Sequence, residues 1–318
     1  MVSKSKEAHG EHWSAVCPRK QDFSKALAAA VAYGRRAWHF PWPEWGYNPE
    51  GWGGTHLAIV CPSQGAVRTL AILNGNSESY TLYSAYPVAC EGAKADVKIL
   101  SVNPWGNGIE GTVTGLLGDG AEVAFFDPLF CVNRYKYHFG ETVQIRLAAI
   151  GYVISSIPWI SFDLPEEMGG AELRERLQTA PSEPTPMSME YTVATSKIEE
   201  VGLGEWRFIS PIGDTSSFMF NDNRIVQLGI RFHPLTTCAL DALEIPLYVH
   251  EDSIKGIDKL HNGQLVRGTY WLQGSLATSL EELNRPTPLL SSPEATAGRM
   301  VSQETGLLQK VMAFLRGR

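Results

Sequence analysis

The spacing of apolar and polar residues predicts a chain made mostly of short strands, with one clear helix near its start. In the stretch 22–38, apolar residues recur every three or four positions and alanine is frequent, which is typical of an amphipathic helix. Apolar runs follow at 55–61, 66–73 and 79–86, and each has the length and composition of a strand. The turn-forming residues 74–76 separate the last two runs, so we expect these runs to form a hairpin.

Two longer stretches are typical of separate β units. Between 96 and 160, about five apolar segments are separated by turns that contain glycine or proline. A second series of strand-like segments runs from 190 to 278. The stretch 164–189 between them begins with a short polar segment that can form a helix and continues as a proline- and serine-rich linker. We therefore expect a domain boundary there.

The two β units are weakly alike. The sequences HFGETVQIRL at 138–147 and HNGQLVRG at 261–268 each place a turn glycine before an alternating strand. In this pattern both units resemble OB-fold-like small barrels, in which tight turns connect strongly curved strands. The resemblance covers about half of the chain and implies a mainly β (α+β) fold with two OB-like barrels as a tandem repeat. Such folds often bind oligonucleotides, oligosaccharides or proteins.

These patterns divide the chain into five predicted regions. An N-terminal helix, an aromatic loop and strands that pack on the first barrel occupy 1–90. The first barrel follows at 91–163, the helix and linker at 164–189, and the second barrel at 190–280. A flexible connector and an amphipathic docking helix complete the chain at 281–318.

The C-terminal stretch 301–316 regains helical spacing after the connector. A short helix beyond a flexible connector is not stable alone, so we expect it to dock on its own body, on another chain or on a membrane surface. We predict that a protein partner or a second copy of the chain contacts its apolar face, formed by Leu307, Leu308, Val311, Met312 and Leu315.

Composition and charge narrow the function classes. The chain has 318 residues, of which 44% are hydrophobic and 19% charged, as in a globular protein of roughly two domains. No apolar run reaches the roughly 18 residues that cross a bilayer, and the polar start lacks the apolar core of a signal peptide. We therefore expect a cytoplasmic protein without a membrane span.

The net charge of −7 is unevenly distributed. Residues 1–36 carry seven Lys/Arg against three Asp/Glu, and residues 299–318 carry four against one, which leaves −14 for the stretch between them. An acidic body argues against a broad surface that follows phosphates, although local basic grooves remain open. As possible phosphate contacts in such a groove we single out Arg134, Lys136 and Arg146.

Motifs for cofactor and metal chemistry are weak. The segment 106–111 matches G-x-G-x-x-G, but strand and turn residues follow it where a dinucleotide site needs a helix, so we expect a fortuitous match. The five cysteines form no C-x-x-C pair and predict reduced thiols, and the apolar surroundings of Cys131 and Cys238 predict that these two are buried. We predict no cofactor, no metal site and no catalytic residue.

Two groups of histidines are the weaker candidates for chemistry. His9, His12 and Cys17 lie close enough in sequence to bind zinc, but a solvated N-terminal tail is the favoured interpretation. Three further histidines with neighbouring carboxylates form an acid/base or metal site only if the fold gathers them; otherwise they belong to a solvated rim. This group comprises His233, Asp241, His250, Glu251, Asp252, Asp258 and His261.

Aromatic residues form the most informative candidate site. Four of the nine tryptophans lie within 38–52, among prolines and glycines that exclude a long regular element. These rings either plug the end of a barrel, which we favour, or form a stacking surface for bases or partner side chains. The candidate stacking residues are Trp42, Trp45, Tyr47 and Trp52.

Three functions follow in order of preference. The first is a non-catalytic binding or assembly protein, because no compact catalytic motif is present and the C-terminal helix is detachable. The second is binding of single-stranded nucleic acid by the barrels through the aromatic and basic candidates. The third is a hydrolase or metal-dependent enzyme of a class that the motifs do not reveal.

Overall fold

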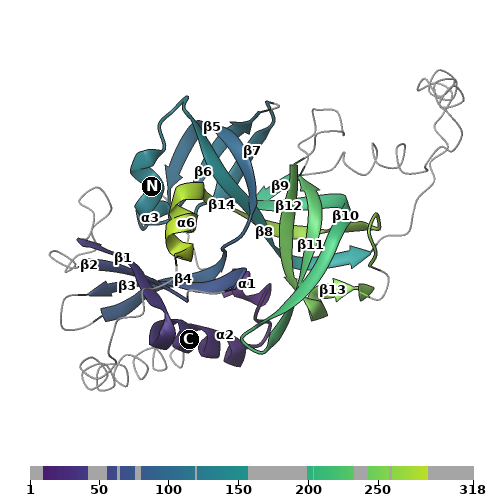
Figure 1. Cartoon of the computed structure of the whole chain (residues 1–318), viewed down its shortest axis with the longest axis horizontal. Helices are drawn as coiled ribbons and strands as arrows, with labels where there is room; N and C mark the ends of the chain where they lie inside the picture. The colour runs from purple at the N-terminus through teal and green to yellow at the C-terminus, as the bar shows by residue number, and fades with distance from the viewer. Residues whose placement is uncertain are drawn as a thin grey trace, which may run out of the picture.

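Strands make up most of the structure (Figure 1). This computed structural model describes residues 10–41, 56–62, 65–75, 80–118, 120–156, 199–202, 204–232, 243–257 and 260–285. The mainly β class predicted from the sequence is confirmed, with few helices among the described residues. None of the helices in these ranges is long and apolar enough to cross a membrane.

The smaller of the two sheets is antiparallel and has the order β1-β2-β3-β4. Its strands are β1 (Arg35–Pro41), β2 (His56–Cys61), β3 (Val67–Gly75) and β4 (Tyr80–Ala89). The last three match the predicted strands, and β3 and β4 form the predicted hairpin up to the pair Gly75–Tyr80. The turn beyond Gly75 lies outside the described residues.

Helix α2 (Lys20–Tyr33) confirms the predicted N-terminal helix but is shorter than expected. It ends at Tyr33 because the chain turns at Gly34, whose N–H donates to the Ala30 carbonyl, and then enters β1. A Cβ at Gly34 would lie 2.5 Å from a methyl group of Val60, so only glycine fits where the helix crosses the sheet. Helical spacing alone does not show that this contact stops the helix.

The larger sheet is mixed and contains the other strands that the structure describes. In chain order these are β5 (Ala93–Pro104), β6 (Gly111–Leu117), β7 (Glu122–Phe126), β8 (Thr142–Ser156), β9 (Glu199–Gly202), β10 (Glu205–Phe220), β11 (Asn223–Phe232), β12 (Leu243–His250), β13 (Ile254–Lys255) and β14 (Leu265–Leu276). The remaining short helices of the described residues are α1 (Gly10–Ser14), α3 (Phe130–Asn133), the 3-10 helices η1 (Arg134–Lys136) and η4 (Glu251–Ser253), and α6 (Ala277–Asn284).

Two long strands, β8 and β14, hold this sheet together. They pair antiparallel from Val266–Ser156 to Leu276–Ile145. Strands β5 to β7 lie on one side of this pair and β10 to β12 on the other (Figure 1). The strands on both sides of the predicted linker therefore belong to one sheet.

This sheet corrects the prediction of two separate barrels. Its strands curl in a ring that is not a true barrel, and β7 meets β14 only at the pair Phe126–Gln273. Each predicted unit needs a strand from the other unit, because β14 pairs with β8 over most of its length. Local hydrophobic patterns identify strands but do not specify which strands pair. The five region boundaries stay predictions.

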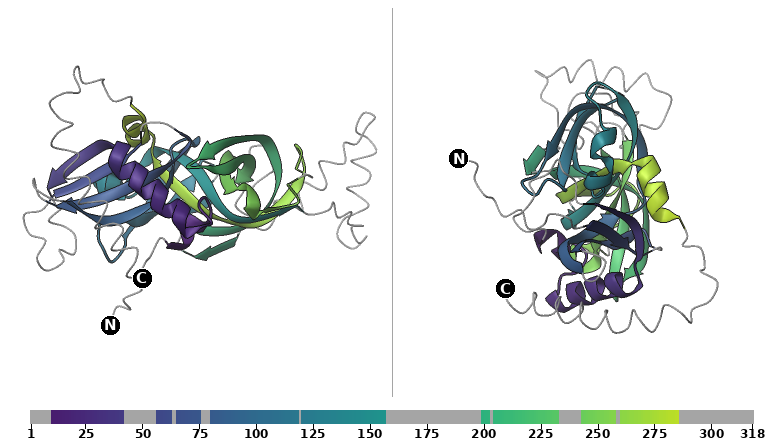
Figure 2. Two further views of the ribbon diagram at one scale, coloured as in Figure 1. Left: turned by 90° about the horizontal axis from the view of Figure 1, so that it is seen from below. Right: turned by 90° about the vertical axis from the view of Figure 1, so that its left-hand side faces the viewer.

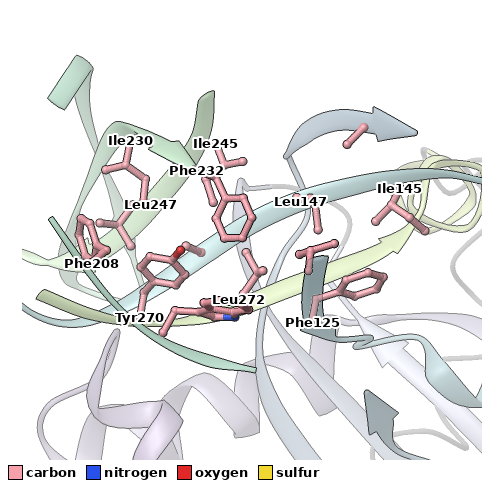
Figure 3. Close-up of a cluster of buried hydrophobic side chains, with 14 of the residues drawn as sticks. Phe125, Ile145, Leu147, Phe208, Ile230, Phe232, Ile245, Leu247, Tyr270 and Leu272 are labelled. Atoms are coloured by element: carbon pink, nitrogen blue, oxygen red, sulfur yellow. The ribbon is translucent and has the colours of Figure 1, made fainter. Parts of the chain in front are cut away.

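The main core lies inside the curled sheet. Figure 3 shows that its apolar side chains follow β8 and β14, from Phe125 and Ile145 at one end to Phe208 and Tyr270 at the other. Strand β14 is buried on both faces: Tyr270 points into this core, whereas Trp271 belongs to a second core against the small sheet. Both aromatic side chains are fully buried.

The layers follow from these two cores. Helix α2 covers one face of the small sheet, where Leu27 packs on Ala58 and Ala71 (Figures 1 and 2). The opposite face of the small sheet packs on the large sheet around Ile150 and Trp271. The small sheet is therefore covered on both faces, by α2 on one and by the large sheet on the other.

Candidate binding surface

The segment between β7 and β8 presents large aromatic side chains to solvent. The side chain of Phe139 is 82% exposed and that of Tyr135 is 54% exposed, whereas Tyr137 between them is only 5% exposed. Basic residues alternate with these rings. We name this feature the aromatic–basic surface; its members are Arg134, Tyr135, Lys136, His138 and Phe139.

Tyr137 determines which side chains of this segment face outward. Its hydroxyl donates a hydrogen bond to Asp127 Oδ2 at 2.7 Å, and both residues are buried. Because Tyr137 is held inward, the residues on either side of it turn toward solvent. The exposure of Tyr135 and Phe139 thus results from a buried anchor rather than from a loose loop.

Asp127 is the centre of a buried hydrogen-bond network. Its Oδ1 accepts from the Leu129 N–H and the Ser275 hydroxyl, both at 2.8 Å. Its Oδ2 accepts from Asn133 Nδ2 at 2.9 Å as well as from Tyr137. Burial raises the pKa of Asp127, and the four donors oppose that rise because they favour the ionised carboxylate. The network fixes the segment after β7 to β14.

Helix α6 extends this support. The Ser279 hydroxyl donates to Asn133 Oδ1 at 2.5 Å, and Lys136 Nζ donates to the same hydroxyl at 3.2 Å. Ser279 and Asn133 are buried, whereas Lys136 is exposed. The base of the aromatic–basic surface is therefore fixed to two elements that lie far away in sequence.

The far end of the segment is fixed to β5. Gly140 has a φ of +81°, its N–H donates to the Ile99 carbonyl, and the Ile99 N–H donates to the Glu141 carbonyl, both at 2.8 Å. A side chain is strained at this φ, which explains the glycine that follows Phe139. The turn predicted at this glycine is present, as is the corresponding turn at Gly263, where φ is +83°.

Two of the three predicted phosphate contacts belong to this surface. Arg134 and Lys136 lie on η1, and the guanidinium of Arg134 lies 5.8 Å from the ring centre of Tyr135. Arg146 lies on β8, where Glu281 binds its guanidinium at 3.4 Å and the Gly92 carbonyl accepts from it at 3.3 Å. The structure thus places Arg146 in an ion pair with α6.

The other predicted binding residues lie outside the described residues. They are the stacking candidates Trp42, Trp45, Tyr47 and Trp52 and the docking face of Leu307, Leu308, Val311, Met312 and Leu315. These assignments stay predictions.

The prediction of a solvated N-terminal tail is wrong for the part that the structure describes. Trp13, Ala15 and Cys17 are buried between the two sheets. The indole N–H of Trp13 donates to the Ala85 carbonyl of β4 at 3.0 Å, and the His250 N–H of β12 donates to the Ala15 carbonyl at 3.0 Å. This segment therefore joins the sheets. The sequence pattern does not reveal this burial, because most residues of the segment are polar and only its few apolar residues pack between the sheets.

A chain of polar contacts ends at His12. Its Nδ1 is hydrogen-bonded to the Tyr152 hydroxyl, which donates to Glu205 Oε1 at 2.9 Å. Because the single phenolic proton goes to Glu205, His12 acts as the donor toward Tyr152. The imidazole also stacks on Trp271. His12 thus has a structural role in attaching α1 to the large sheet.

The candidate zinc ligands of this region are only partly described. Burial raises the pKa of Cys17 to about 12, and His9 lies outside the described residues. No group of three or more His, Cys, Asp or Glu side chains with metal-binding geometry occurs in the parts of the chain that the structure describes.

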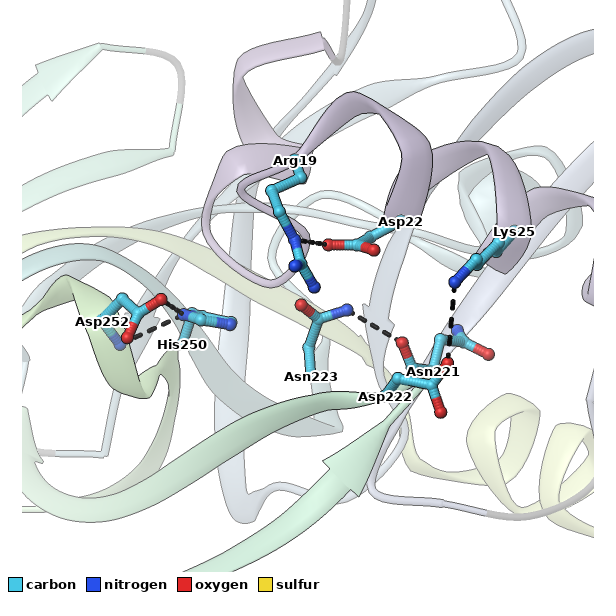
Figure 4. Close-up of polar contacts among 8 residues, drawn as sticks. All are labelled: Arg19, Asp22, Lys25, Asn221, Asp222, Asn223, His250 and Asp252. Atoms are coloured by element: carbon cyan, nitrogen blue, oxygen red, sulfur yellow. Dashed lines mark hydrogen bonds and ion pairs between the residues drawn. The ribbon is translucent and has the colours of Figure 1, made fainter.

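The second histidine group is only partly described. His250 is buried, and its Nδ1 accepts from the Asp252 N–H at 3.1 Å (Figure 4). His261 is exposed. His250 therefore departs from the expected solvated rim, because its backbone also binds the N-terminal segment. His233, Asp241 and Asp258 lie outside the described residues.

Figure 4 also shows how α2 meets the tip of the β10–β11 hairpin. Asn221 and Asp222 have positive φ values of 46° and 66°, as a two-residue hairpin turn requires. Lys25 Nζ lies 3.8 Å from Asp222 Oδ2, and both side chains are well exposed, so this ion pair contributes little to stability. The buried backbone contact at Ala15 is the stronger connection.

The glycine-rich motif is a hairpin loop between β5 and β6. Asn107 Oδ1 accepts from the N–H groups of Ile109 and Glu110 at 3.1 and 3.0 Å. A Cβ at Gly111 would lie 2.6 Å from the Phe130 ring. Its glycines thus serve a turn and a close approach, in agreement with the strand and turn expected after the motif.

Sequence reasoning missed Asp127, Tyr135 and Phe139. A usable signal was present in RYKYHF at 134–139, where aromatic and basic residues alternate. Period-two alternation normally predicts a strand with one buried face. Here the strand does not form, and only the tertiary position of Asp127 shows which ring is inside.

Comparisons of this chain with protein-family models, with curated proteins and with solved structures found no significant match, so its function is argued from its own geometry.

Proposed function

We propose that the protein acts by binding a macromolecular partner through the aromatic–basic surface, which is the binding or assembly role expected from the sequence. The observation that carries this proposal is the 82% exposure of Phe139 on a segment held by the Tyr137–Asp127 hydrogen bond. Large aromatic side chains normally bury their area, and those at interfaces supply much of the binding energy.

The anchoring of the surface supports binding because it lowers the entropic cost. A partner that binds a loose loop must order it, at roughly 0.5–1.5 kcal/mol for each immobilised side chain. The buried network around Asp127 and the Gly140 turn have already ordered this segment. The partner therefore loses less of its binding free energy to ordering than it would on a loose loop.

Two further parts of the proposal come from the sequence. A relation to OB-like folds is supported by the positive-φ glycines Gly140 and Gly263, each of which lies two residues before the first residue of its strand, β8 or β14. The predicted helix at 301–316 is proposed as a second contact, for a protein partner or for a second copy of the chain.

The test removes the two exposed rings without touching the anchor. The double variant Tyr135→Ser/Phe139→Ser leaves Tyr137 in place, and Met219→Ser is the matched control, because Met219 is a 64% exposed side chain on β10. We expect the double variant to lose affinity-captured partners, or self-association in light scattering, while the control retains them. Identical capture and identical mass for all three proteins would contradict the proposal.

A further inference from the structure

We infer that the partner of the aromatic–basic surface is a single-stranded nucleic acid. This inference rests on the proposed function and names the class of partner. It stands on the exposed rings of Tyr135 and Phe139 and on the cations interleaved with them along one anchored segment.

The exposed rings fit unpaired bases. Every base has a flat face that stacks on an aromatic side chain, and such stacking tolerates any sequence. Phe139 has no polar group of its own, so stacking and apolar contact are its only modes of recognition. A duplex keeps its base faces inside the stack, which makes a single strand the better match to these rings.

Three basic side chains near the exposed rings could contact the phosphates of a bound single strand. Arg134 lies against the Tyr135 ring and Lys136 follows it on η1. Lys98 is exposed on β5 opposite Thr142, three residues beyond Phe139. A strand whose bases stack on the two rings would bring its phosphates toward these three cations.

Nearby acidic groups limit the contact. Glu141, two residues after Phe139, is exposed, and the stretch 37–298 as a whole is strongly acidic. We therefore expect about three phosphate contacts and no extended backbone track. For single strands the logarithm of the binding constant falls by about 0.7 for each contact per tenfold rise in salt, which gives a slope of about −2.

An acidic protein segment is the competing partner. It would satisfy the same cations, but its carboxylates offer no ring to stack on Tyr135 and Phe139. Loss of binding on removal of Phe139, with a persistent salt slope, is thus characteristic of nucleic acid. Loss on removal of the cations alone is characteristic of an acidic peptide.

The experiment measures fluorescence anisotropy of labelled 12-nucleotide mixed-sequence DNA and RNA against the full chain at 50 to 300 mM salt. We expect Phe139→Ala to weaken binding roughly 10-fold or more, and Met219→Ala to leave it unchanged. Arg134→Gln/Lys136→Gln should flatten the salt slope by about one unit or more. Duplex DNA and polyglutamate should compete poorly.

Three results would overturn the inference. In the first, the oligonucleotides do not bind at 50 mM salt. In the second, Phe139→Ala binds them as tightly as the wild-type protein does. In the third, polyglutamate displaces the labelled oligonucleotide as effectively as an unlabelled oligonucleotide does. If oligonucleotides fail to bind while the Tyr135→Ser/Phe139→Ser variant still loses a captured protein partner, the proposed function stands and only the class of partner is wrong. If oligonucleotides fail to bind and the Tyr135→Ser/Phe139→Ser variant keeps every captured partner and its self-association, both proposals fail.

Discussion

The imidazole of His12 stacks on the indole of Trp271, with ring centres 3.9 Å apart and planes within 4° of parallel. The two residues are separated by most of the chain, since His12 lies in α1 and Trp271 in the last strand of the large sheet. Trp271 is fully buried, and His12 covers one face of its ring. This stack closes the second core at the point where the N-terminal segment enters it.

Replacing His12 by alanine should therefore loosen the N-terminal segment. His12→Ala removes the stack on Trp271 and the hydrogen bond to Tyr152, and we expect a loss of about 1–2 kcal/mol in the free energy of unfolding. Urea denaturation measures the loss. His138→Ala is the matched control, because His138 is exposed and should change stability by less than about 0.5 kcal/mol. Equal effects of the two substitutions would show that the stack contributes nothing specific.

Replacing Asp127 by asparagine should destabilise the protein because it disrupts the buried hydrogen-bond network. Each carboxylate oxygen accepts two hydrogen bonds, and the amide introduced by Asp127→Asn would direct its own N–H groups at donors such as the Leu129 N–H. We expect this substitution to cost about 2–4 kcal/mol in urea denaturation. A variant as stable as the wild-type protein would mean that the network carries little energy.

The effect of Ser275→Ala on the free energy of unfolding should depend on pH, because Ser275 donates a hydrogen bond to the Asp127 carboxyl group. Burial holds the pKa of Asp127 above its ordinary value of 3.8, so the folded protein keeps a proton that the unfolded chain has already released. The contribution of this group to stability therefore falls as the pH rises between the two pKa values. Ser275→Ala removes a donor that favours the ionised carboxylate and raises this pKa further.

The destabilisation by Ser275→Ala should consequently grow as the pH rises from 4 through the range in which the folded protein releases the Asp127 proton, by about 1 kcal/mol. Urea denaturation of the wild-type protein and the variant at a series of pH values from 4 to 9 gives the difference directly. A loss of stability that stays constant or shrinks as the pH rises over this series would contradict a role of the Ser275 hydroxyl in stabilising the charged form.

The glycines of the 106–111 segment should differ in their tolerance of a methyl group. A Cβ at Gly111 would meet the Phe130 ring at 2.6 Å and the Asn103 carbonyl oxygen at 2.7 Å, whereas a Cβ at Gly106 meets nothing within 4 Å. We expect Gly111→Ala to cost about 1–3 kcal/mol and Gly106→Ala to be close to neutral, as measured by thermal unfolding. Equal tolerance at both positions would argue against the close-packed role of Gly111.

Most of the strands and the main helix could be predicted from the sequence. Apolar runs such as those that became β2 and β3 carry their own signal, because a run of that length bounded by turn residues has few other stable conformations. The turn at Gly140 was predictable for a similar reason, since a positive φ favours glycine. The candidate surface was predictable only in part: Arg134 and Lys136 were identified as basic residues, but the rings beside them were not.

Long-range pairing and burial were decided by the tertiary structure. Nothing within β14 specifies that it pairs with β8, and this pairing turns two expected barrels into one curled sheet. The same holds for Tyr137, whose inward position depends on Asp127 and, through the network around it, on Ser275 of β14. The sequence by itself determined which segments are strands, because that depends on neighbours along the chain. Only the tertiary structure decided which side chains are covered, because that depends on residues brought together from distant segments.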